Sequence, residues 1–292
     1  MTNATGSAMP AVFLKDRSLL SVSGAEAQSF LQNLITTDII SLEAGEARPG
    51  ALLTPQGKIL FDFMIWQDGD GYTIESDAGQ RDGLLKRLTM YKLRAAVTLA
   101  PRAEDGVTVS WGEGAEGVRD SHGVWDSRFA KAGVTLIRQP GKHGDGEEAL
   151  YDALRIAHGI VTSGQDFALQ DAFPHDVLMD FNGGLSFRKG CYVGQEVVSR
   201  MQHRGTARRR VVTVSAATAL PETGTEISAA GKPVGTLGSV EGDHGLAIVR
   251  IDRAGAAIAA GTPLLAGETP VSLVLPQWSG LVFPTSADEA SA

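Results

Sequence analysis

The chain has 292 residues, of which 43% are apolar, and its formal net charge at pH 7 is −8. This length predicts two or three domains with sizeable cores, and the acidic balance argues against a protein that coats nucleic acid, so we expect no direct nucleic-acid partner. The single cysteine excludes an internal disulfide and a metal site built from several cysteines of one chain.

The start of the chain has no segment of the kind that targets a domain to a membrane or for secretion. The residues before Pro10 are mostly small and polar, and no apolar run approaches the roughly 20 residues that a membrane-spanning helix needs. These features predict a soluble, cytoplasmic protein with no membrane partner.

The first part of the chain alternates strands and helices. Val12 to Val22 has the apolar alternation of a strand pair, and a helix is predicted over Ala25 to Ile35, where Ser23 and Glu26 have the spacing of a capping box. Asp77 is placed to cap a second helix. Further strands are predicted over 51–54, 59–66, 72–75 and 95–99. This order indicates an α+β sheet with helices on one side.

The middle of the chain has shorter strands and one more helix. The strands are predicted over 107–111, 124–129 and 133–138. The helix is predicted over Glu147 to Gly159, with the glycine as its stop. It is expected to bury Leu150, Leu154 and Ala157. His158, at its end, is better placed to interact with the helix dipole than to act as a catalytic base.

From Arg208 onward, β-type runs are separated by glycine and proline turns, with one alanine-rich interruption. The runs lie at 211–214, 225–228, 234–240, 246–251 and 271–275. They predict a small antiparallel barrel. The predicted domains are therefore an α+β region over 10–205, a β-barrel over 206–283 and a disordered tail over 284–292. The junction between the first two is a preferred place for a ligand site.

This junction carries a strongly basic segment, residues 188–210. The segment holds seven Lys or Arg residues against one acid, Glu196, and contains the only cysteine, Cys191. Arg188 and Lys189 precede the cysteine, and their charges would lower the pKa of the thiol and make it a better nucleophile or metal ligand. A cysteine can also be a small buried hydrophobe. Charge context alone leaves both interpretations open.

The run Lys189-Gly190-Cys191-Tyr192-Val193-Gly194-Gln195-Glu196 resembles the signature K-G-C-[FY]-x-G-Q-E of the YgfZ family. Members of that family are folate-binding relatives of the glycine-cleavage aminomethyltransferase that act in the assembly or repair of iron–sulfur proteins. All eight positions agree, which is far more specific than a lone glycine motif. The similarity continues in the same order through four further segments and covers nearly the whole chain: 30–39, 53–62, 154–167 and 208–210.

The resemblance implies both a fold and a function. The implied fold is α+β and aminomethyltransferase-like, with ferredoxin-like halves and a C-terminal antiparallel β-barrel arranged as a ring around a central channel that holds tetrahydrofolate. The implied function is that of an accessory protein for assembling or repairing iron–sulfur proteins, with Cys191 as a reactive centre and a possible transient ligand of a cluster. The implied partners are iron–sulfur client proteins or assembly factors, together with folate.

The resemblance also assigns roles to single residues. Cys191 and Lys189 are the expected catalytic pair, and Lys189 would bind an anion or lower the pKa of the thiol. The rest of the signature loop is formed by Gly190, Tyr192, Gly194, Gln195 and Glu196. The last two residues either position a substrate or a labile metal, or cap the helix that starts there.

The expected folate-binding residues come from three parts of the chain. They are Asp62, Arg155, Arg208 and Arg210. Because side chains alternate along a strand, Arg208 and Arg210 would face the same side and neutralise the glutamate tail of folate through charge-assisted hydrogen bonds. An exposed basic strand edge that protects against aggregation is the alternative.

Two positions depart from the aminomethyltransferase pattern. Phe61 replaces its first aspartate, and Ala157 replaces the glutamate that faces the pterin. Neither side chain can accept a hydrogen bond, so a folate-dependent aminomethyltransferase or other one-carbon transferase is the alternative rather than the main prediction. A folate-sensing scaffold without chemistry is a third hypothesis. His175, a lone histidine in a loop, is not expected to bind a metal.

Overall fold

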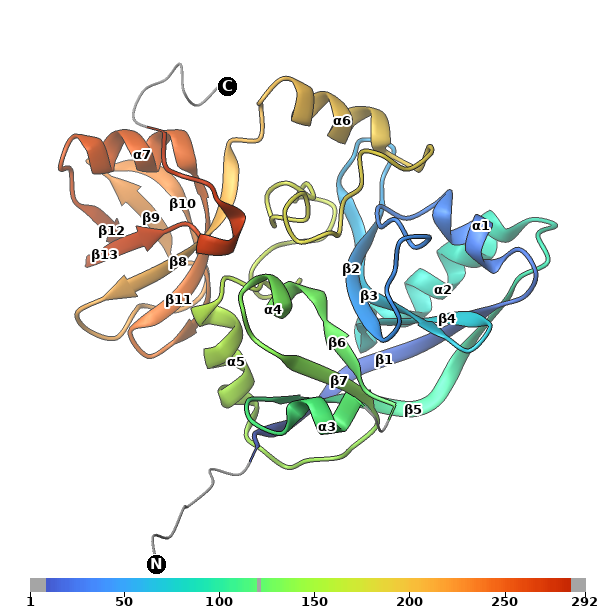
Figure 1. Ribbon diagram of the computed structural model, residues 1–292. Helices are drawn as coiled ribbons and strands as arrows, with labels where there is room; N and C mark the ends of the chain where they lie inside the picture. Colours follow the sequence, from blue (N-terminus) through green and yellow to red (C-terminus); the bar gives the residue numbers. More distant parts are fainter. Residues whose placement is uncertain (1–8, 120–121, 285–292) are drawn as a thin grey trace, which may run out of the picture.

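The computed structural model describes residues 9–119 and 122–284 and contains two closed β-barrels (Figure 1). The first barrel has the strand order β1-β4-β3-β2-β6-β7-β5, and the second has the order β10-β11-β8-β13-β12-β9. Strands of the first barrel are β1 (Ala11–Ser23), β2 (Glu46–Leu53), β3 (Ile59–Asp68), β4 (Gly71–Asp77), β5 (Thr98–Trp111), β6 (Val124–Asp126) and β7 (Leu136–Pro140). Strands of the second are β8 (Arg209–Ala216), β9 (Glu226–Ala229), β10 (Lys232–Glu241), β11 (His244–Arg250), β12 (Leu264–Ala266) and β13 (Thr269–Val274).

Short helices surround and connect the barrels. They are α1 (Ala27–Gln32), α2 (Ala78–Lys92), α3 (Ala115–Arg119), α4 (Ser127–Lys131), α5 (Glu148–Ala157), α6 (Gln195–His203), α7 (Ile251–Ala259) and the 3-10 helix η1 (Gln277–Ser279). Over 9–119 and 122–284, none of the helices combines the length and the apolar character needed to span a bilayer.

The strands of the first barrel form a closed ring, whereas the prediction was a sheet with helices on one side. β1 is one long strand rather than a strand pair, and it pairs with β4 along one edge and β5 along the other. Its register with β5 shifts between Leu14 and Ser18, and such irregularities bend a strand and increase its twist. β6 and β7 then bridge from β2 to β5 and complete the ring of strands.

The two predicted helix caps in this part have different outcomes. Asp77 caps α2 as predicted, because its carboxylate accepts a hydrogen bond from the Gly79 N–H at 2.8 Å. The capping box predicted at the first helix is wrong. Glu26 instead accepts a hydrogen bond from the Ala96 N–H at 2.6 Å, so its carboxylate ties the helix start to the chain before β5. The helix itself spans only residues 27–32.

Helix α5 lies between the barrels and buries a different face from the one predicted. Its buried residues are Tyr151, Arg155 and Ile156, whereas Leu150 is 52% exposed and Ala157 is also exposed. The prediction of the buried face relied on the spacing of apolar residues, whereas the helix buries Tyr151 and Arg155, which both carry polar groups. Its predicted stop is correct, since Gly159 has a φ of +69° and a Cβ there would lie 2.4 Å from a Pro276 side-chain atom.

The C-terminal part is the predicted antiparallel barrel, and the alanine-rich interruption forms α7. Between the barrels runs segment 160–194, drawn in yellow-green to yellow in Figure 1, which leads through turns into α6. The predicted tail falls outside the described residues from position 285 onward.

Candidate functional site

Cys191 is exposed on the loop that leads into α6. The next glycine, Gly194, caps this helix with a φ of +79°, and a Cβ there would lie 2.6 Å from the Thr54 carbonyl oxygen. This close approach requires glycine, because any other side chain would push the loop away from the first barrel. The loop therefore holds the sulfur at the surface, beside the start of a helix.

Hydrogen bonds of the Lys189 and Tyr192 side chains hold this loop in place. The Lys189 ammonium donates to the carbonyl oxygens of Ile35 at 2.7 Å and Thr37 at 2.8 Å, and it lies 5.2 Å from the centroid of the Tyr192 ring. Burial lowers the pKa of Lys189 to about 8 and raises the pKa of Tyr192, whose hydroxyl donates to the Ser186 carbonyl at 3.1 Å. The lysine is thus bonded to backbone oxygens of the first barrel's connecting segment.

The Gln195–Glu196 pair forms the first turn of α6. Glu196 is acidic at a helix start, which the helix dipole favours, and its carboxylate pairs with Arg200 at 2.6 Å on the exposed face. The N-cap of α6 is Gly194 and no described side chain makes a capping hydrogen bond there, so the capping role that the sequence left open for these two residues is not found.

Each arginine of the 208–210 run has a different environment. Arg210 is buried and donates to the His175 carbonyl at 2.6 Å and to both carboxylate oxygens of Asp180 at 2.9 Å. Arg209 donates to Asp171 at 3.2 Å, and Arg208 is exposed. The structure therefore does not bring the two predicted tail-binding arginines together.

His175 is fully buried beneath α6. Its Nε2 lies 3.2 Å from the Gln202 Oε1, and its Nδ1 is buried without a hydrogen-bond partner. Burial and the nearby Arg210 lower the pKa of His175 to about 4, so the ring is neutral at pH 7. Across the described part of the chain, no group of three or more His, Cys, Asp or Glu side chains is placed to hold a metal ion.

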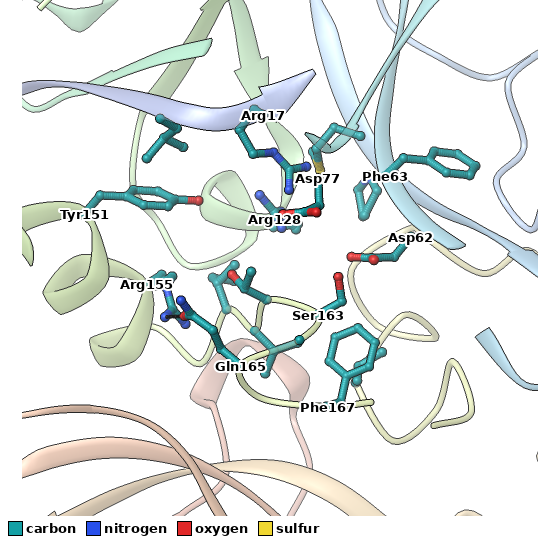
Figure 2. Close-up of a pocket in the computed structure, with 18 of the residues that line it drawn as sticks. Arg17, Asp62, Phe63, Asp77, Arg128, Tyr151, Arg155, Ser163, Gln165 and Phe167 are labelled. Carbon is teal, nitrogen blue, oxygen red and sulfur yellow. Dashed lines mark hydrogen bonds between the residues drawn. The ribbon is translucent and has the colours of Figure 1, made fainter. Parts of the chain in front are cut away.

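A cavity of about 330 Å³ lies where the first barrel meets α5, segment 159–182 and Trp278 (Figure 2). Two of the predicted folate-binding residues, Asp62 and Arg155, line it. The Asp62 carboxylate points into the cavity and accepts from the Gln80 Nε2 at 3.3 Å. The same amide nitrogen donates to the Ser163 hydroxyl at 2.9 Å, while the Gln80 Oε1 is buried without a partner.

The other residue is Arg155, and each of its three guanidinium nitrogens donates a hydrogen bond to another residue of the protein. Its guanidinium donates to Asp152 at 2.6 Å, Asp166 at 2.9 Å, Gln165 at 2.7 Å and the Ser239 hydroxyl at 2.6 Å. Since Ser239 belongs to β10, this arginine joins α5 to the second barrel.

A buried chain of charges forms the wall of the cavity on the first-barrel side. Arg138 donates to Glu75, with its Nε at 2.7 Å, and to Asp126 at 3.0 Å. Arg17 pairs with Glu75 at 2.8 Å, and Arg128 pairs with Asp126 at 2.7 Å. The sequence prediction missed this chain. The sequence contained one feature that could have indicated these buried charges: charged residues stand inside the predicted strands at 72–75 and 133–138.

The chain is similar to proteins of one known family. Residues 208–281 match the family described as "CAF17, C-terminal beta-barrel domain". The human protein named "Iron-sulfur cluster assembly factor IBA57, mitochondrial" is 30% identical, and the match covers 84% of this chain and 78% of the human protein. The chain belongs to the IBA57 family.

Other IBA57 proteins are longer than the matched part. The homolog from Pyricularia oryzae is 33% identical over 68% of this chain and 55% of that protein. The chain thus spans about half the length of this relative and of the relatives from Coccidioides immitis and Chaetomium globosum.

A solved structure shows the fold of this IBA57 family member. The glycine cleavage system aminomethyltransferase T from Bartonella henselae superposes with a TM-score of 0.69 over 92% of this chain and 85% of that chain, at 15% sequence identity. At this identity the likeness concerns the fold alone. Together with the barrel match, it confirms the predicted aminomethyltransferase-like α+β fold with a C-terminal barrel.

Two predictions change in the light of these relatives. The resemblance to the YgfZ family holds at the level of the larger related group, since the relatives are IBA57 proteins. The predicted cytoplasmic location is contradicted, because the IBA57 relatives are named as mitochondrial. That prediction rested on the lack of apolar segments, which reports on crossing a bilayer and not on the compartment in which a protein works.

Proposed function

We propose that this protein is an accessory factor in the assembly or repair of iron–sulfur proteins, which binds tetrahydrofolate in the cavity and handles a cluster through Cys191. The observation that carries the proposal is the exposed position of the sole cysteine, on an anchored loop, in a chain of the IBA57 family. The human relative is named as an iron–sulfur cluster assembly factor.

One exposed thiol favours transient handling of a cluster. Stable clusters are held by several ligands, commonly four cysteines. Cys191 is the only cysteine of this chain, so further ligands must come from a partner protein. The cluster is then cargo shared between two chains, and its release requires this chain to give up a single bond. The sulfur's place beside α6, on a surface that can meet another protein, suits such a hand-over.

The volume and the polar groups of the cavity support the proposal that it binds a folate. Its volume of about 330 Å³ lies in the range of small-molecule sites. Asp62 offers a carboxylate acceptor for the amino and ring N–H groups of a pterin, beside the Ser163 hydroxyl. A bound tetrahydrofolate would supply a reduced pterin able to carry one-carbon units. The resemblance to the folate-binding YgfZ family supports the same ligand.

Substituting Cys191 tests the cluster-handling step. In cells that lack the native protein, Cys191→Ala is expected to leave iron–sulfur enzymes several-fold less active under oxidative stress than the wild-type chain does, whereas Ser199→Ala in α6 serves as a control that retains function. Cluster content is measured by visible absorption and iron analysis of a purified client enzyme. Equal client activity with wild type and Cys191→Ala would rule out the role of the thiol.

A one-carbon transferase remains a second candidate because Asp62 lies in the cavity of an aminomethyltransferase-like fold. The positions that depart from the enzyme pattern supply no acid here: Phe61 packs against the apolar core, and Ala157 is exposed on α5. Release of a one-carbon product that is lost in Asp62→Asn and kept in Cys191→Ala would favour this function over cluster handling.

A further inference from the structure

Two guanidinium groups of the cavity wall each have one nitrogen free of protein partners. Arg17 uses its Nε and Nη2 on Glu75, and Arg128 uses its Nε and Nη2 on Asp126. No partner within 9–119 and 122–284 takes the Nη1 of either arginine, and both residues line the cavity. The two side chains keep 18% and 16% of their surface exposed, while their carboxylate partners keep none.

We propose that Arg17, Arg128 and Tyr151 form a carboxylate-binding subsite of the cavity, which takes the glutamyl tail of the folate. This inference rests on the proposed folate binding and adds to it the direction in which the ligand lies. The pterin would face Asp62 and Ser163, and the tail would face the charged wall of the first barrel. In Figure 2, the Arg17 guanidinium, the Tyr151 hydroxyl and the Asp62 carboxylate all point into the same space.

The charge balance of the wall favours an anion. The chain of charges contains three guanidiniums, of Arg17, Arg128 and Arg138, and two carboxylates, of Glu75 and Asp126. Burial opposes ionisation of both carboxyls, but the arginines outweigh it and lower both pKa values. Both carboxylates are therefore charged at pH 7, and within this chain of charges one guanidinium is in excess, while Asp77 also lines the cavity and accepts from the Gly79 N–H. Such an excess positive charge is costly away from water unless an anion meets it.

Tyr151 completes the subsite with a hydroxyl. Its ring packs against Phe129 with centroids 6.1 Å apart, which fixes the direction of the side chain. The side chain is buried, yet the structure records no hydrogen bond for its hydroxyl to any described residue. The phenol lies close enough to Arg128 and Arg138 to affect both electrostatically. A free donor beside free guanidinium nitrogens suits a carboxylate, which accepts several hydrogen bonds at once.

The remaining acids of the cavity would direct an anion toward this wall. Apart from Asp62 and Asp77, the acids that line the cavity are Asp16, Glu148 and Asp152, and Asp152 is paired with Arg155. Burial raises the pKa of Glu148, and Asp152 and Asp16 add to that rise, so these carboxyls lie near one another. They would repel a glutamyl tail, whereas the Arg17–Arg128 side would attract it. A ligand with donors at one end and carboxylates at the other therefore has one favourable orientation.

Binding of two probes to single variants tests the subsite. Tetrahydrofolate has the glutamyl tail, and 6-methyltetrahydropterin has the same ring without it. By anaerobic titration calorimetry at fixed salt, Arg17→Gln and Arg128→Gln are each expected to weaken tetrahydrofolate binding about tenfold, and Tyr151→Phe about threefold. Binding of 6-methyltetrahydropterin should be the same in all forms. The matched control is Arg102→Gln, which removes a paired arginine outside the cavity.

The possible results separate this inference from the function on which it rests. If wild type binds tetrahydrofolate and the arginine variants bind it equally well, the subsite is ruled out while folate binding stands. The same conclusion follows if the arginine variants lose as much affinity for 6-methyltetrahydropterin as for tetrahydrofolate. If wild type binds neither probe, folate binding fails and the subsite fails with it. Should the arginine variants not fold, Tyr151→Phe decides, because its hydroxyl bonds no described residue.

Discussion

At the scale of single residues, Glu75 determines the chemistry of the cavity wall. Burial alone would raise the pKa of this carboxyl, but Arg138 and Arg17 outweigh burial and lower the pKa to about 2. The carboxylate therefore stays ionised under any physiological condition and fixes the directions of two arginines. Without it, Arg17 would lose the carboxylate that positions it against the cavity, and Arg138 would keep only Asp126.

This residue predicts an acid-dependent loss of stability. Because the folded-state pKa of about 2 lies below the ordinary 4.5, the pair contributes stability that is complete above pH 4.5 and is lost as the pH falls from 4.5 to 2. The contribution is about 3 kcal/mol by the size of the shift. Glu75→Gln should cost about 3–5 kcal/mol at pH 7, since it leaves buried guanidinium charge without its partner.

Urea unfolding followed by circular dichroism at pH 7 and pH 3 measures both effects. Glu113→Gln, at an exposed position, is the control and should keep the wild-type stability at both values. A Glu75→Gln protein as stable as wild type at pH 7 would show that the arginines find other partners.

The residues of this wall could not be identified from the sequence because their partners are far apart in it. Arg17 and Glu75 are separated by 58 positions, and Arg138 and Glu75 by 63. They meet only because β1 pairs with β4 and the barrel closes around them. Local signals succeeded where the partner is near, as for Asp77, which caps the helix that starts one residue later.

At the scale of elements, the loop before α6 is held by one buried lysine. Lys189 connects it to the carbonyl oxygens of Ile35 and Thr37, more than 150 positions away. The signature therefore contains at least one residue whose contacts set the position of the loop that exposes Cys191.

Lys189→Met should loosen this loop while keeping most of the buried volume. The variant leaves two buried carbonyl oxygens without a donor, and we expect a loss of about 1–3 kcal/mol in the free energy of unfolding. Limited proteolysis should cut the loop faster, and the rate at which Cys191 reacts with a thiol reagent should change. The neighbouring exposed Arg188→Met is the control for loss of charge alone. Unchanged proteolysis and unchanged stability would mean that the loop is held by its glycines and Tyr192.

The elements themselves were predicted unevenly, for physical reasons. The C-terminal strands and the stop of α5 at Gly159 follow from local backbone preferences, and both were correct. The buried face of α5 was wrong because apolar spacing assumes an apolar neighbour, whereas this helix faces a cavity and bonds Arg155 to the second barrel. Closure of the first barrel depends on bulged pairing of β1 with β5, which no local pattern reports.

At the scale of the whole molecule, one carboxylate joins the second barrel to α5 and to the segment between the barrels. Asp166 lies in the segment between them, and its Oδ1 accepts from the backbone N–H of Ser239 in β10 at 2.7 Å. Its Oδ2 accepts from the Thr162 N–H at 2.7 Å and from Arg155 of α5 at 2.9 Å. The contact is close, since a Cβ on Gly238 would lie 2.6 Å from the Asp166 Oδ1. The cavity lies beside this connection, so its shape depends on how the barrels are joined.

Asp166→Asn is therefore expected to uncouple the second barrel from α5 and the rest of the molecule. The amide is nearly the same size, but it replaces one acceptor oxygen by an NH₂ group, so either the Ser239 N–H or the Thr162 and Arg155 donors face another donor. Loss of the charge also leaves the buried Arg155 with only Asp152, at an expected cost of about 3–5 kcal/mol. In scanning calorimetry, wild type should unfold in one transition and the variant in two, because the C-terminal barrel no longer shares its stability with the first. Asp243→Asn, exposed at the far end of the same β10–β11 hairpin, should unfold like wild type. One transition at an unchanged midpoint in Asp166→Asn would show that the other contacts of the second barrel, such as Arg210 with Asp180, are sufficient to hold it.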